Sequence, residues 1–201
     1  MGSCVSNSNN TKKNNIIILG LEGAGKTTIL YQLTKNKRVP AIPTVGKNEE
    51  TFNYKKKKYN MIDFGGKQKS LNYFNQYFQN TLGIIFVIDG NNKEQFEQSY
   101  IYFKQIFQEQ SLKGIPILIL LNKKDLKVNN EEQNLDGLNI SNNQNQFNNQ
   151  TENNIKQIFK LQHLQSCLWK IQEVSGNTRE GLLEGFQWLY ENMYTIHKIR
   201  N

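Results

Sequence analysis

The sequence predicts an α/β protein whose sheet is mostly parallel and has one antiparallel edge. Three continuous apolar runs support this, Ile16–Leu19, Ile84–Ile88 and Ile115–Leu121, because such runs are typical of strands that are covered on both faces. Between the last two runs, aromatic residues recur at steps of four, three and four from Phe96 to Phe107. This spacing predicts a helix with one buried face, so strands alternate with helices along the chain.

The remaining elements follow from their own patterns. A helix is predicted over Thr27–Thr34, directly after the first strand and its glycine-rich connection. The segments Thr51–Tyr54 and Tyr59–Asp63 flank the charged run Lys55–Lys58, which predicts a hairpin with a basic tip and supplies the antiparallel edge. Apolar residues at helical spacing from Leu182 to Ile196 predict a C-terminal helix with a buried face.

Length and composition exclude several classes of protein. A chain of 201 residues fits one domain. Its longest apolar run, Ile115–Leu121, is far shorter than the roughly 20 residues that a spanning helix needs, and no apolar segment follows the start as in a secretory signal. Two cysteines, Cys4 and Cys167, make no disulfide framework, so a reducing cytosol is expected. The net charge of +8 suits nucleic acid, anionic lipid or a phosphorylated ligand, and does not choose among them.

One stretch differs in composition from the rest of the chain. Of the 26 residues from Asn129 to Asn154, 15 are Asn or Gln, and the stretch has few apolar residues and no sustained period. We expect a disordered or mobile insertion at about 129–154, because the stretch buries too little apolar surface to offset the entropy of ordering. The alternative is a binding role for this insertion.

A phosphate-binding loop is the strongest chemical motif. Residues 20–27 read G-L-E-G-A-G-K-T and match G-x-x-x-x-G-K-[ST] between a predicted strand and a predicted helix. Gly20 and Gly25 let the backbone curl so that N–H groups and the helix N-terminus face phosphate oxygens. Lys26 adds a positive charge within reach of the β and γ phosphates, and Thr27 offers a hydroxyl to Mg²⁺. ATPases, small-molecule kinases and GTPases share this loop.

A second motif identifies the base. Asn122, Lys123, Lys124 and Asp125 follow the strand Ile115–Leu121 directly. The Asp125 carboxylate is suited to accept two hydrogen bonds from guanine N1 and its 2-amino group, a donor pair that adenine lacks. The stem of Lys123 would lie over the base, and Asn122 would tie this loop to the phosphate loop. Ligands of open α/β sheets bind beyond the C-terminal ends of strands, where this motif is placed.

With these motifs the sequence resembles the small GTPases, and more narrowly the ADP-ribosylation factor (Arf) and Arf-like family. The resemblance covers most of residues 15–195 apart from the insertion. The stretches that carry it are 20–30, 42–46 (I-P-T-V-G), 63–66 (D-F-G-G), 77–81 and 181–189. It implies the P-loop NTPase (small G-protein) fold, with a mostly parallel sheet of six strands, one antiparallel edge strand and helices on both faces.

The resemblance also implies roles for individual residues. Thr44 would coordinate Mg²⁺ together with Thr27, Asp63 would hold the ion through water, and the Gly66 N–H would bond the γ-phosphate. Ser175 and Gly176 would form the last guanine loop. The full set expected to contact GTP or GDP is Gly20, Leu21, Glu22, Gly23, Ala24, Gly25, Lys26, Thr27, Thr28, Asp63, Gly66, Asn122, Lys123, Lys124, Asp125, Ser175 and Gly176.

The chain departs from the family at two places. Lys67 stands where the family has the Gln that orients the attacking water, and a Lys cannot accept a hydrogen bond from that water. The sequence therefore predicts slow intrinsic hydrolysis. Lys67 either stabilises γ-phosphate charge or points into solvent. Of the family's aromatic trio along the switches only Tyr77 remains, with Lys47 and Ile62 at the other two positions, so a different partner surface is expected.

The N-terminus carries a lipidation pattern. Residues 1–6, M-G-S-C-V-S, fit myristoylation of Gly2, and Cys4 beside it is a candidate for palmitoylation. One myristoyl chain binds membranes only marginally, so Cys4 or the pair Lys12 and Lys13 would supply the second signal. Residues 7–15 have no apolar face, which argues against a helix that inserts on GTP binding. The run Lys55–Lys58 is either a solvated tip or a contact for anionic lipid.

Together these observations predict a flexible acylated tail over residues 1–14 and a single GTP-binding domain over 15–201. The expected protein is a monomeric GTPase switch on the cytosolic face of a membrane (Golgi or another endomembrane by family analogy), with an exchange factor, an activating protein and effectors as partners. The main alternative is a GTP-binding adaptor that does not hydrolyse. A nucleic-acid-binding protein is disfavoured because aromatic residues do not interleave with the basic run at 55–58. The base motif opposes a small-molecule kinase.

Overall fold

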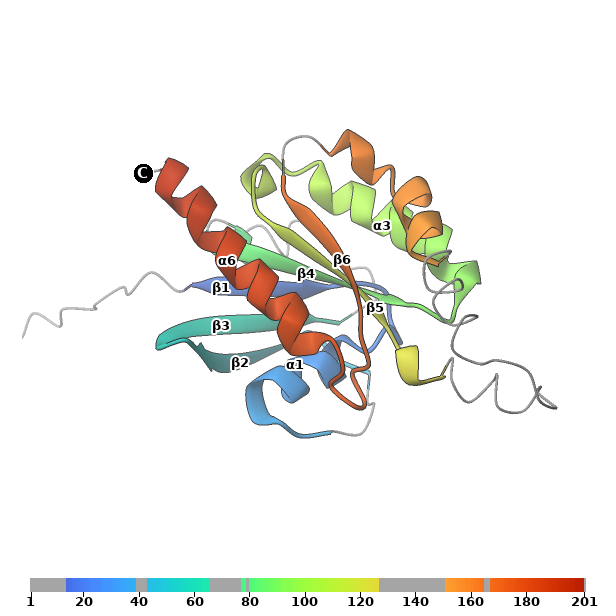
Figure 1. The fold of residues 1–201 in the computed structure, drawn as a ribbon, viewed down its shortest axis with the longest axis horizontal. Coiled ribbons are helices and arrows are strands. Elements are labelled where there is room, and N and C mark those ends of the chain that lie inside the picture. The colour runs from blue at the N-terminus through green and yellow to red at the C-terminus, as the bar shows by residue number, and fades with distance from the viewer. Residues whose placement is uncertain are drawn as a thin grey trace, which may run out of the picture.

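The computed structural model describes residues 14–38, 43–65, 77–78, 80–126, 151–164 and 167–200, with side chains described as far as Tyr194. Its centre is a six-stranded sheet of order β2-β3-β1-β4-β5-β6 (Figure 1). The strands are β1 (Asn15–Leu19), β2 (Lys47–Tyr54), β3 (Lys57–Phe64), β4 (Thr81–Asp89), β5 (Ile117–Asn122) and β6 (Trp169–Glu173). Only the pair β2–β3 is antiparallel, and the other four pairs are parallel. The predicted α/β class and its antiparallel edge are confirmed.

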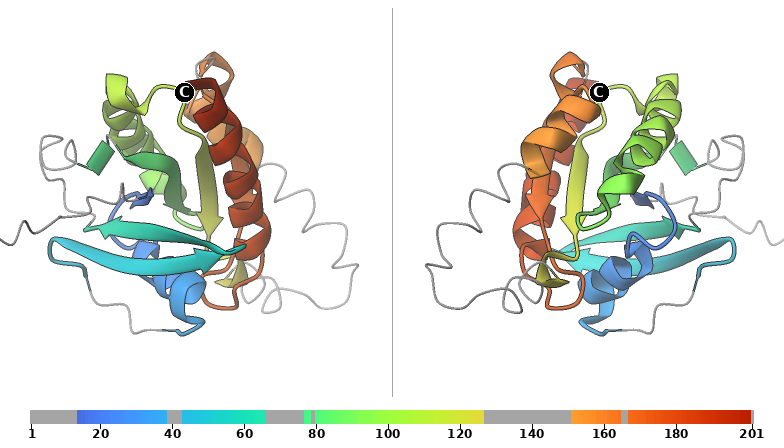
Figure 2. Two further views of the ribbon diagram at one scale, coloured as in Figure 1. Left: turned by 90° about the vertical axis from the view of Figure 1, so that its left-hand side faces the viewer. Right: turned by 90° about the vertical axis from the view of Figure 1, so that its right-hand side faces the viewer.

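Helices cover both faces of the sheet. The longer helices of the described residues are α1 (Lys26–Lys35), α3 (Phe96–Phe107), α6 (Leu182–Arg200) and the helical residues 151–158. Three short 3₁₀ turns, η1 (Lys93–Gln95), η2 (Gln110–Leu112) and η3 (Leu161–His163), lie in the connections between elements. Side chains of α1 and α6 share one buried cluster, and side chains of α3 and of residues 151–158 share the other. Figure 2 shows α6 and α3 on opposite sides of the strands.

The alternation of side chains along each strand explains the two clusters. In β1, Ile16 and Ile18 face the α1 and α6 layer, whereas Ile17 and Leu19 face the α3 layer, and all four are fully buried. A strand that is covered on both faces needs apolar residues at every position, because consecutive side chains point to opposite faces. This is why the central strands appear in the sequence as unbroken apolar runs.

The structure differs from the sequence-based prediction in detail. The hairpin turn has only two residues, Lys55 and Lys56, both with left-handed φ, and the rest of the basic run belongs to β3. Strand β5 begins at Ile117 because Pro116 has no N–H to donate to a ladder. The edge strand β6 has one buried residue, Ile171, so no apolar run marked it. Residues 151–154, the end of the Asn/Gln-rich stretch, are helical, with Thr151 buried.

The parallel strands bring the sequence motifs to one edge of the sheet. The chain leaves β1, β3, β4 and β5 at the same edge, because these strands run in the same direction. The phosphate loop follows β1 and the 122–125 motif begins at the last residue of β5. Among the described residues, no helix combines the length and the apolar character that crossing a membrane requires.

Candidate functional site

The loop between β1 and α1 is shaped by glycines at two tight contacts. Gly20 has φ of 139°, and a Cβ there would lie 2.2 Å from the carbonyl oxygen of Val87 in β4. Gly25 has φ of 95°, and a Cβ there would lie 2.2 Å from the side-chain nitrogen of Asn122. Side chains are therefore excluded at both positions by space as well as by backbone conformation. The loop ends at the N-terminus of α1, which favours a bound anion.

The lysine of this loop is buried and folded back on the loop. Lys26 Nζ donates a hydrogen bond of 2.8 Å to the carbonyl oxygen of Leu21, and the residue is only 6% exposed. Burial lowers the pKa of the Lys26 ammonium, while the negative charges of Asp63 and Glu22 act in the opposite direction. The Lys26 ammonium is thus buried against a neutral carbonyl, and a negatively charged ligand such as a phosphate chain would stabilise its charge.

Three side chains to which the resemblance gives a role in binding Mg²⁺ lie together. Thr27 Oγ1 donates to Asp63 Oδ2 at 2.6 Å, and Thr44 Oγ1 lies 2.8 Å from Thr27 Oγ1. Asp63 is fully buried, and its other oxygen, Oδ1, has no hydrogen-bond partner in the described part of the chain. Burial raises the pKa of Asp63, and the hydrogen bond from Thr27 opposes this rise. Two hydroxyls and a buried carboxylate with a free oxygen are oxygen donors of the kind Mg²⁺ takes, so the residues fit this ion.

The segment around Thr44 packs directly against the end of β3. The amide of Gly65 donates to the carbonyl oxygen of Gly46 at 2.9 Å, and a Cβ on Gly65 would lie 2.3 Å from the carbonyl oxygen of Thr44. The two segments that the resemblance identifies as switches therefore touch through their backbones. The next two residues of the second segment, Gly66 and Lys67, lie outside the described residues.

Asn122 connects the phosphate loop to the base-binding loops. Its side-chain nitrogen donates to the carbonyl oxygen of Ala24 at 2.8 Å, and its side-chain oxygen accepts from the amide of Gly176 at 2.8 Å. The residue is 3% exposed, so both bonds are shielded from water. The predicted tie to the phosphate loop is present in the structure, and a second tie to the Ser175–Gly176 loop accompanies it.

Residues of the Ser175–Asn177 segment donate hydrogen bonds to Asp125, whose side chain lines the cavity described below. Ser175 Oγ donates to Asp125 Oδ1 at 2.6 Å, and Asn177 Nδ2 donates to Asp125 Oδ2 at 3.3 Å. Lys123 has a left-handed φ of 69°, and its ammonium pairs with Asp89 Oδ2 at 2.7 Å. This ion pair holds the Lys123 stem along the loop, where it can lie against a flat base.

A cavity of about 530 Å³ lies between these loops. It is lined by Gly23, Gly25, Thr28, Arg38, Asn122, Lys123, Asp125, Leu126, Gly176 and Asn177. The structure thus brings the phosphate loop, the 122–125 motif and the Gly176 segment to one concave site, although they are far apart in sequence. Leu21, Glu22, Ala24 and Lys124 belong to the same loops without lining this cavity.

Sequence reasoning missed several residues of the site. Asn48 donates to Thr44 Oγ1 at 3.2 Å and to Asp63 Oδ2 at 3.3 Å, from a strand that the sequence analysis began only at Thr51. Asp89 directly follows the apolar run Ile84–Ile88, and a polar residue at that position is a usable signal for a site. Arg38 carries no such signal, because it lies in an irregular segment after α1.

The three positions of the aromatic trio are also placed. The Lys47 ammonium lies 4.5 Å from the centroid of the Tyr77 ring and also pairs with Glu49. Ile62, in β3, is fully buried in the cluster on the α3 face of the sheet, and Phe64 packs edge-on against Tyr77 at 5.3 Å. A cation thus covers the aromatic ring at this surface. The predicted lipidation sites, Gly2 and Cys4, lie outside the described residues.

Two comparisons with known proteins agree with this geometry. The model of the ADP-ribosylation factor family matches residues 1–193 of the chain. Among solved structures, the chain is similar to the Arl6 BBS3 small GTPase from Trypanosoma brucei with the bound nucleotide analogue GppNp. The TM-score is 0.70 at 22% sequence identity, and the match covers 91% of this chain and 98% of that one. At this identity the structural match establishes the fold.

Proposed function

Since the chain belongs to the ADP-ribosylation factor family, a family of small GTPases that act as GTP-binding switches, we propose that it binds GTP and GDP with Mg²⁺ and signals through effectors at a membrane. The observation that carries this proposal is the double hydrogen bond of Asn122, to Ala24 and to Gly176. It joins the phosphate-binding loop to the loops that recognise the base, so a single ligand with phosphates and a guanine fits both.

Residues in and beside the cavity would each bind a different part of the ligand. The loop amides, the α1 N-terminus and Lys26 would hold the phosphates, and the Asp125 carboxylate would accept from guanine N1 and the 2-amino group. Thr27 and Thr44 would offer hydroxyls to Mg²⁺, with Asp63 acting through water, and the ion would neutralise charge on the phosphates. The same Asp63 network includes Asn48, which positions both Thr44 and the carboxylate.

The switch would act through the contact between Thr44 and Gly65. A γ-phosphate that binds Thr44 would order the segment around this residue. Because Gly65 packs against the Thr44 backbone, the segment that begins at Gly65 would become ordered as well. Loss of the γ-phosphate would release both segments together. The pair Lys47 and Tyr77 lies beside this region, so effectors would meet an aromatic ring that is covered by a lysine.

Hydrolysis is proposed to be slow because Lys67 replaces Gln. A Lys side chain has hydrogen-bond donors only, so it cannot orient the attacking water by accepting a hydrogen bond from it. Turnoff of the GTP state would then depend on an activating protein. The second candidate is a GTP-binding adaptor without hydrolysis, favoured by the same residue, and turnover measurements separate the two.

Membrane attachment is proposed through Gly2 and Cys4. Myristoylation of Gly2 follows from residues 1–6, and a palmitoyl group on Cys4 would make the attachment stable. The protein would then act as a monomer on the cytosolic face of a membrane.

Nucleotide exchange tests the proposed function. The full chain is loaded with a fluorescent GDP in Mg²⁺ and challenged with unlabelled GTP, GDP or ATP. We expect GTP and GDP to displace the label at similar concentrations and ATP to have no effect. Displacement by ATP at the concentration that suffices for GTP would overturn the proposed base specificity, and failure to retain labelled GDP would overturn the switch.

A further inference from the structure

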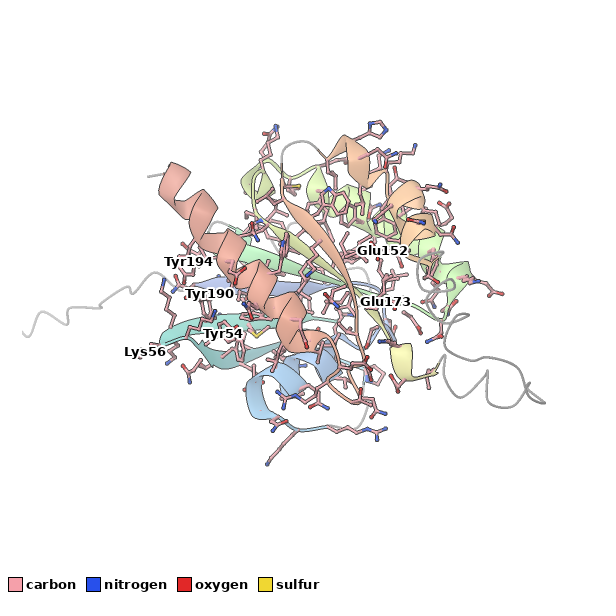
Figure 3. The ribbon with its side chains drawn as sticks, viewed as in Figure 1. Tyr54, Lys56, Glu152, Glu173, Tyr190 and Tyr194 are labelled. Atoms are coloured by element: carbon pink, nitrogen blue, oxygen red, sulfur yellow. The ribbon has the colours of Figure 1, made fainter. Side chains whose placement is uncertain are left out.

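Four consecutive lysines, Lys55–Lys58, form an exposed basic surface, here called the lysine tip, at the end of the β2–β3 hairpin. Strand β3 begins at this tip and runs parallel to β1, whose far end enters the phosphate loop. The lysine tip and the nucleotide cavity therefore lie at opposite ends of the parallel strands. Figure 3 shows Lys56 at the end of the hairpin, on the side of the molecule at which β1 begins.

Carboxylates of the described residues do not neutralise the charge of the lysine tip. Within the described part of the chain, none of the four lysines forms an ion pair with Asp or Glu. Lys55 Nζ lies 5.2 Å from the centroid of the Tyr190 ring, and Lys57 Nζ lies 3.3 Å from that of Tyr194. Aromatic faces attract these ammonium groups without cancelling their charge, so a compact positive surface remains.

Aromatic contacts with α6 hold the lysine tip in place. The Tyr54 ring meets Phe186 and Tyr190 edge-on, each at 5.1 Å, and the Tyr59 hydroxyl is hydrogen-bonded to that of Tyr194. Tyr54, Tyr190 and Tyr194 lie together beside the hairpin in Figure 3. The hairpin end is thus fixed against a helix, and its lysines are presented on a constant face beside tyrosines, the residue type that favours a membrane interface.

The N-terminal segment joins the fold beside the lysine tip. The side-chain nitrogen of Asn14 donates to the carbonyl oxygen of Lys58 at 3.4 Å, and the amide of Asn60 donates to the carbonyl oxygen of Asn14 at 2.9 Å. Two further lysines, Lys12 and Lys13, directly precede Asn14 in the sequence. An acyl chain on Gly2 would therefore be tethered to the edge of the molecule that carries the lysine tip.

We propose that the lysine tip binds the headgroups of an anionic lipid bilayer and turns the nucleotide cavity away from the membrane. The proposal rests on the membrane association in the proposed function and adds the surface that makes contact. Charge complementarity carries it, because a basic surface next to a membrane is attracted to anionic lipid within about a Debye length. The acyl groups would bring the protein to the bilayer, and the lysine tip would add an electrostatic attraction that orients it.

Vesicle sedimentation of the unacylated full chain tests this. Phosphatidylcholine vesicles with and without phosphatidylserine are compared for the wild type, for the double variant Lys56→Gln/Lys58→Gln, and for the control Lys104→Gln/Lys160→Gln. Lys56 and Lys58 contact no aromatic ring of the residues that the structure describes, so their replacement leaves this aromatic packing intact. The control residues are exposed, and Lys160 shares the left-handed φ of Lys56, at 50° against 63°. Both variants lower the net charge by two from +8.

We expect the wild type to bind only the vesicles with phosphatidylserine. The Lys56/Lys58 variant should lose about twenty-fivefold in affinity, because each lysine near such a surface contributes about fivefold. The control should stay within about twofold of the wild type. An equal loss in both variants, equal binding to neutral vesicles, or tighter binding to a single-stranded RNA through the same lysines would overturn the proposal. Nucleotide exchange on the same preparations separates the proposed switch from the proposed lipid contact. A protein that binds the vesicles but not GTP would reject the switch and support the lipid contact of the lysine tip.

Discussion

The side-chain amide of Asn122 donates a hydrogen bond of 2.8 Å to the carbonyl oxygen of Ala24, across 98 residues of sequence. Its oxygen at the same time accepts from the amide of Gly176. One buried side chain therefore fixes three loops of the cavity relative to each other. A ligand that spans the cavity finds its phosphate and base sites already aligned, which reduces the entropy that binding must overcome.

Replacement of Asn122 by Ala should weaken both folding and nucleotide binding. The change leaves the buried Ala24 oxygen and Gly176 amide without partners, so we expect the free energy of unfolding to fall by about 1–3 kcal/mol. Affinity for GDP should fall by about tenfold or more. Denaturant unfolding and GDP titration measure the two effects. Asn91→Ala, which removes an exposed bond to Lys123, is the control and should change either value by less than half as much.

Replacement of Asp63 by Asn should remove the response to Mg²⁺. The shape is preserved and the carboxylate charge is lost, so the water-mediated hold on the ion disappears. In the wild type, chelation of Mg²⁺ should lower GTP affinity by at least about tenfold. The Asp63→Asn protein should start with low affinity and respond to the chelator by less than about twofold. GTP titrations with and without chelator provide the measurement, and an equal response in both proteins would contradict the assignment.

Replacement of Lys67 by Gln should accelerate intrinsic hydrolysis. Gln restores an acceptor for the attacking water, so single-turnover phosphate release from GTP-loaded protein should rise by about tenfold or more. Gln68→Ala is the matched control and should leave the rate unchanged, because Gln68 stands one position after the one at which the family has its Gln. Equal rates for the wild type and Lys67→Gln would show that another group orients the water.

Replacement of Phe186 by Ala should destabilise the fold strongly. Phe186 is fully buried and its ring meets Phe52 at 4.8 Å and Tyr54 at 5.1 Å, which fastens the hairpin to α6. We expect the free energy of unfolding to fall by about 3–5 kcal/mol in denaturant titrations. Leu183→Ala, on the same helix at 46% exposure, should cost less than about 1 kcal/mol. Similar losses in the two variants would argue against the aromatic anchor.

The sequence predicts the central sheet well and its edges less well. Strands such as β1 and β4 are buried on both faces, so their central positions, Ile16–Leu19 and Ile84–Ile88, are all apolar and the pattern is unambiguous. The edge strand β6 buries only Ile171, and the partly exposed residues around it give no apolar run that would predict a strand. The helix over 151–158 emerges from an Asn-rich stretch because tertiary packing of Ile155 and Phe159 outweighs the local composition.

The site could be predicted where chemistry demands a fixed spacing. The phosphate loop and the 122–125 motif each lie within a few residues of one strand, and parallel strands bring them to one edge. Partners that come from distant elements left no such pattern. Asn48 reaches Asp63 only because β2 and β3 pair in register, with Asn48 opposite Asp63. Ser175 reaches Asp125 across 50 residues through the β5–β6 pairing.

The most direct test of a guanine-specific site is the base preference of the Asp125→Asn variant. In the wild type, labelled GDP should be displaced by GTP and GDP and not by ATP or xanthosine triphosphate. An Asn amide at this position donates to the 2-oxo group of xanthine and no longer accepts from the 2-amino group of guanine. The variant should therefore bind guanine nucleotides about tenfold or more weakly and xanthine nucleotides correspondingly more tightly. If wild type and variant show the same order of nucleotides, Asp125 does not read the base, and the account of this site is wrong.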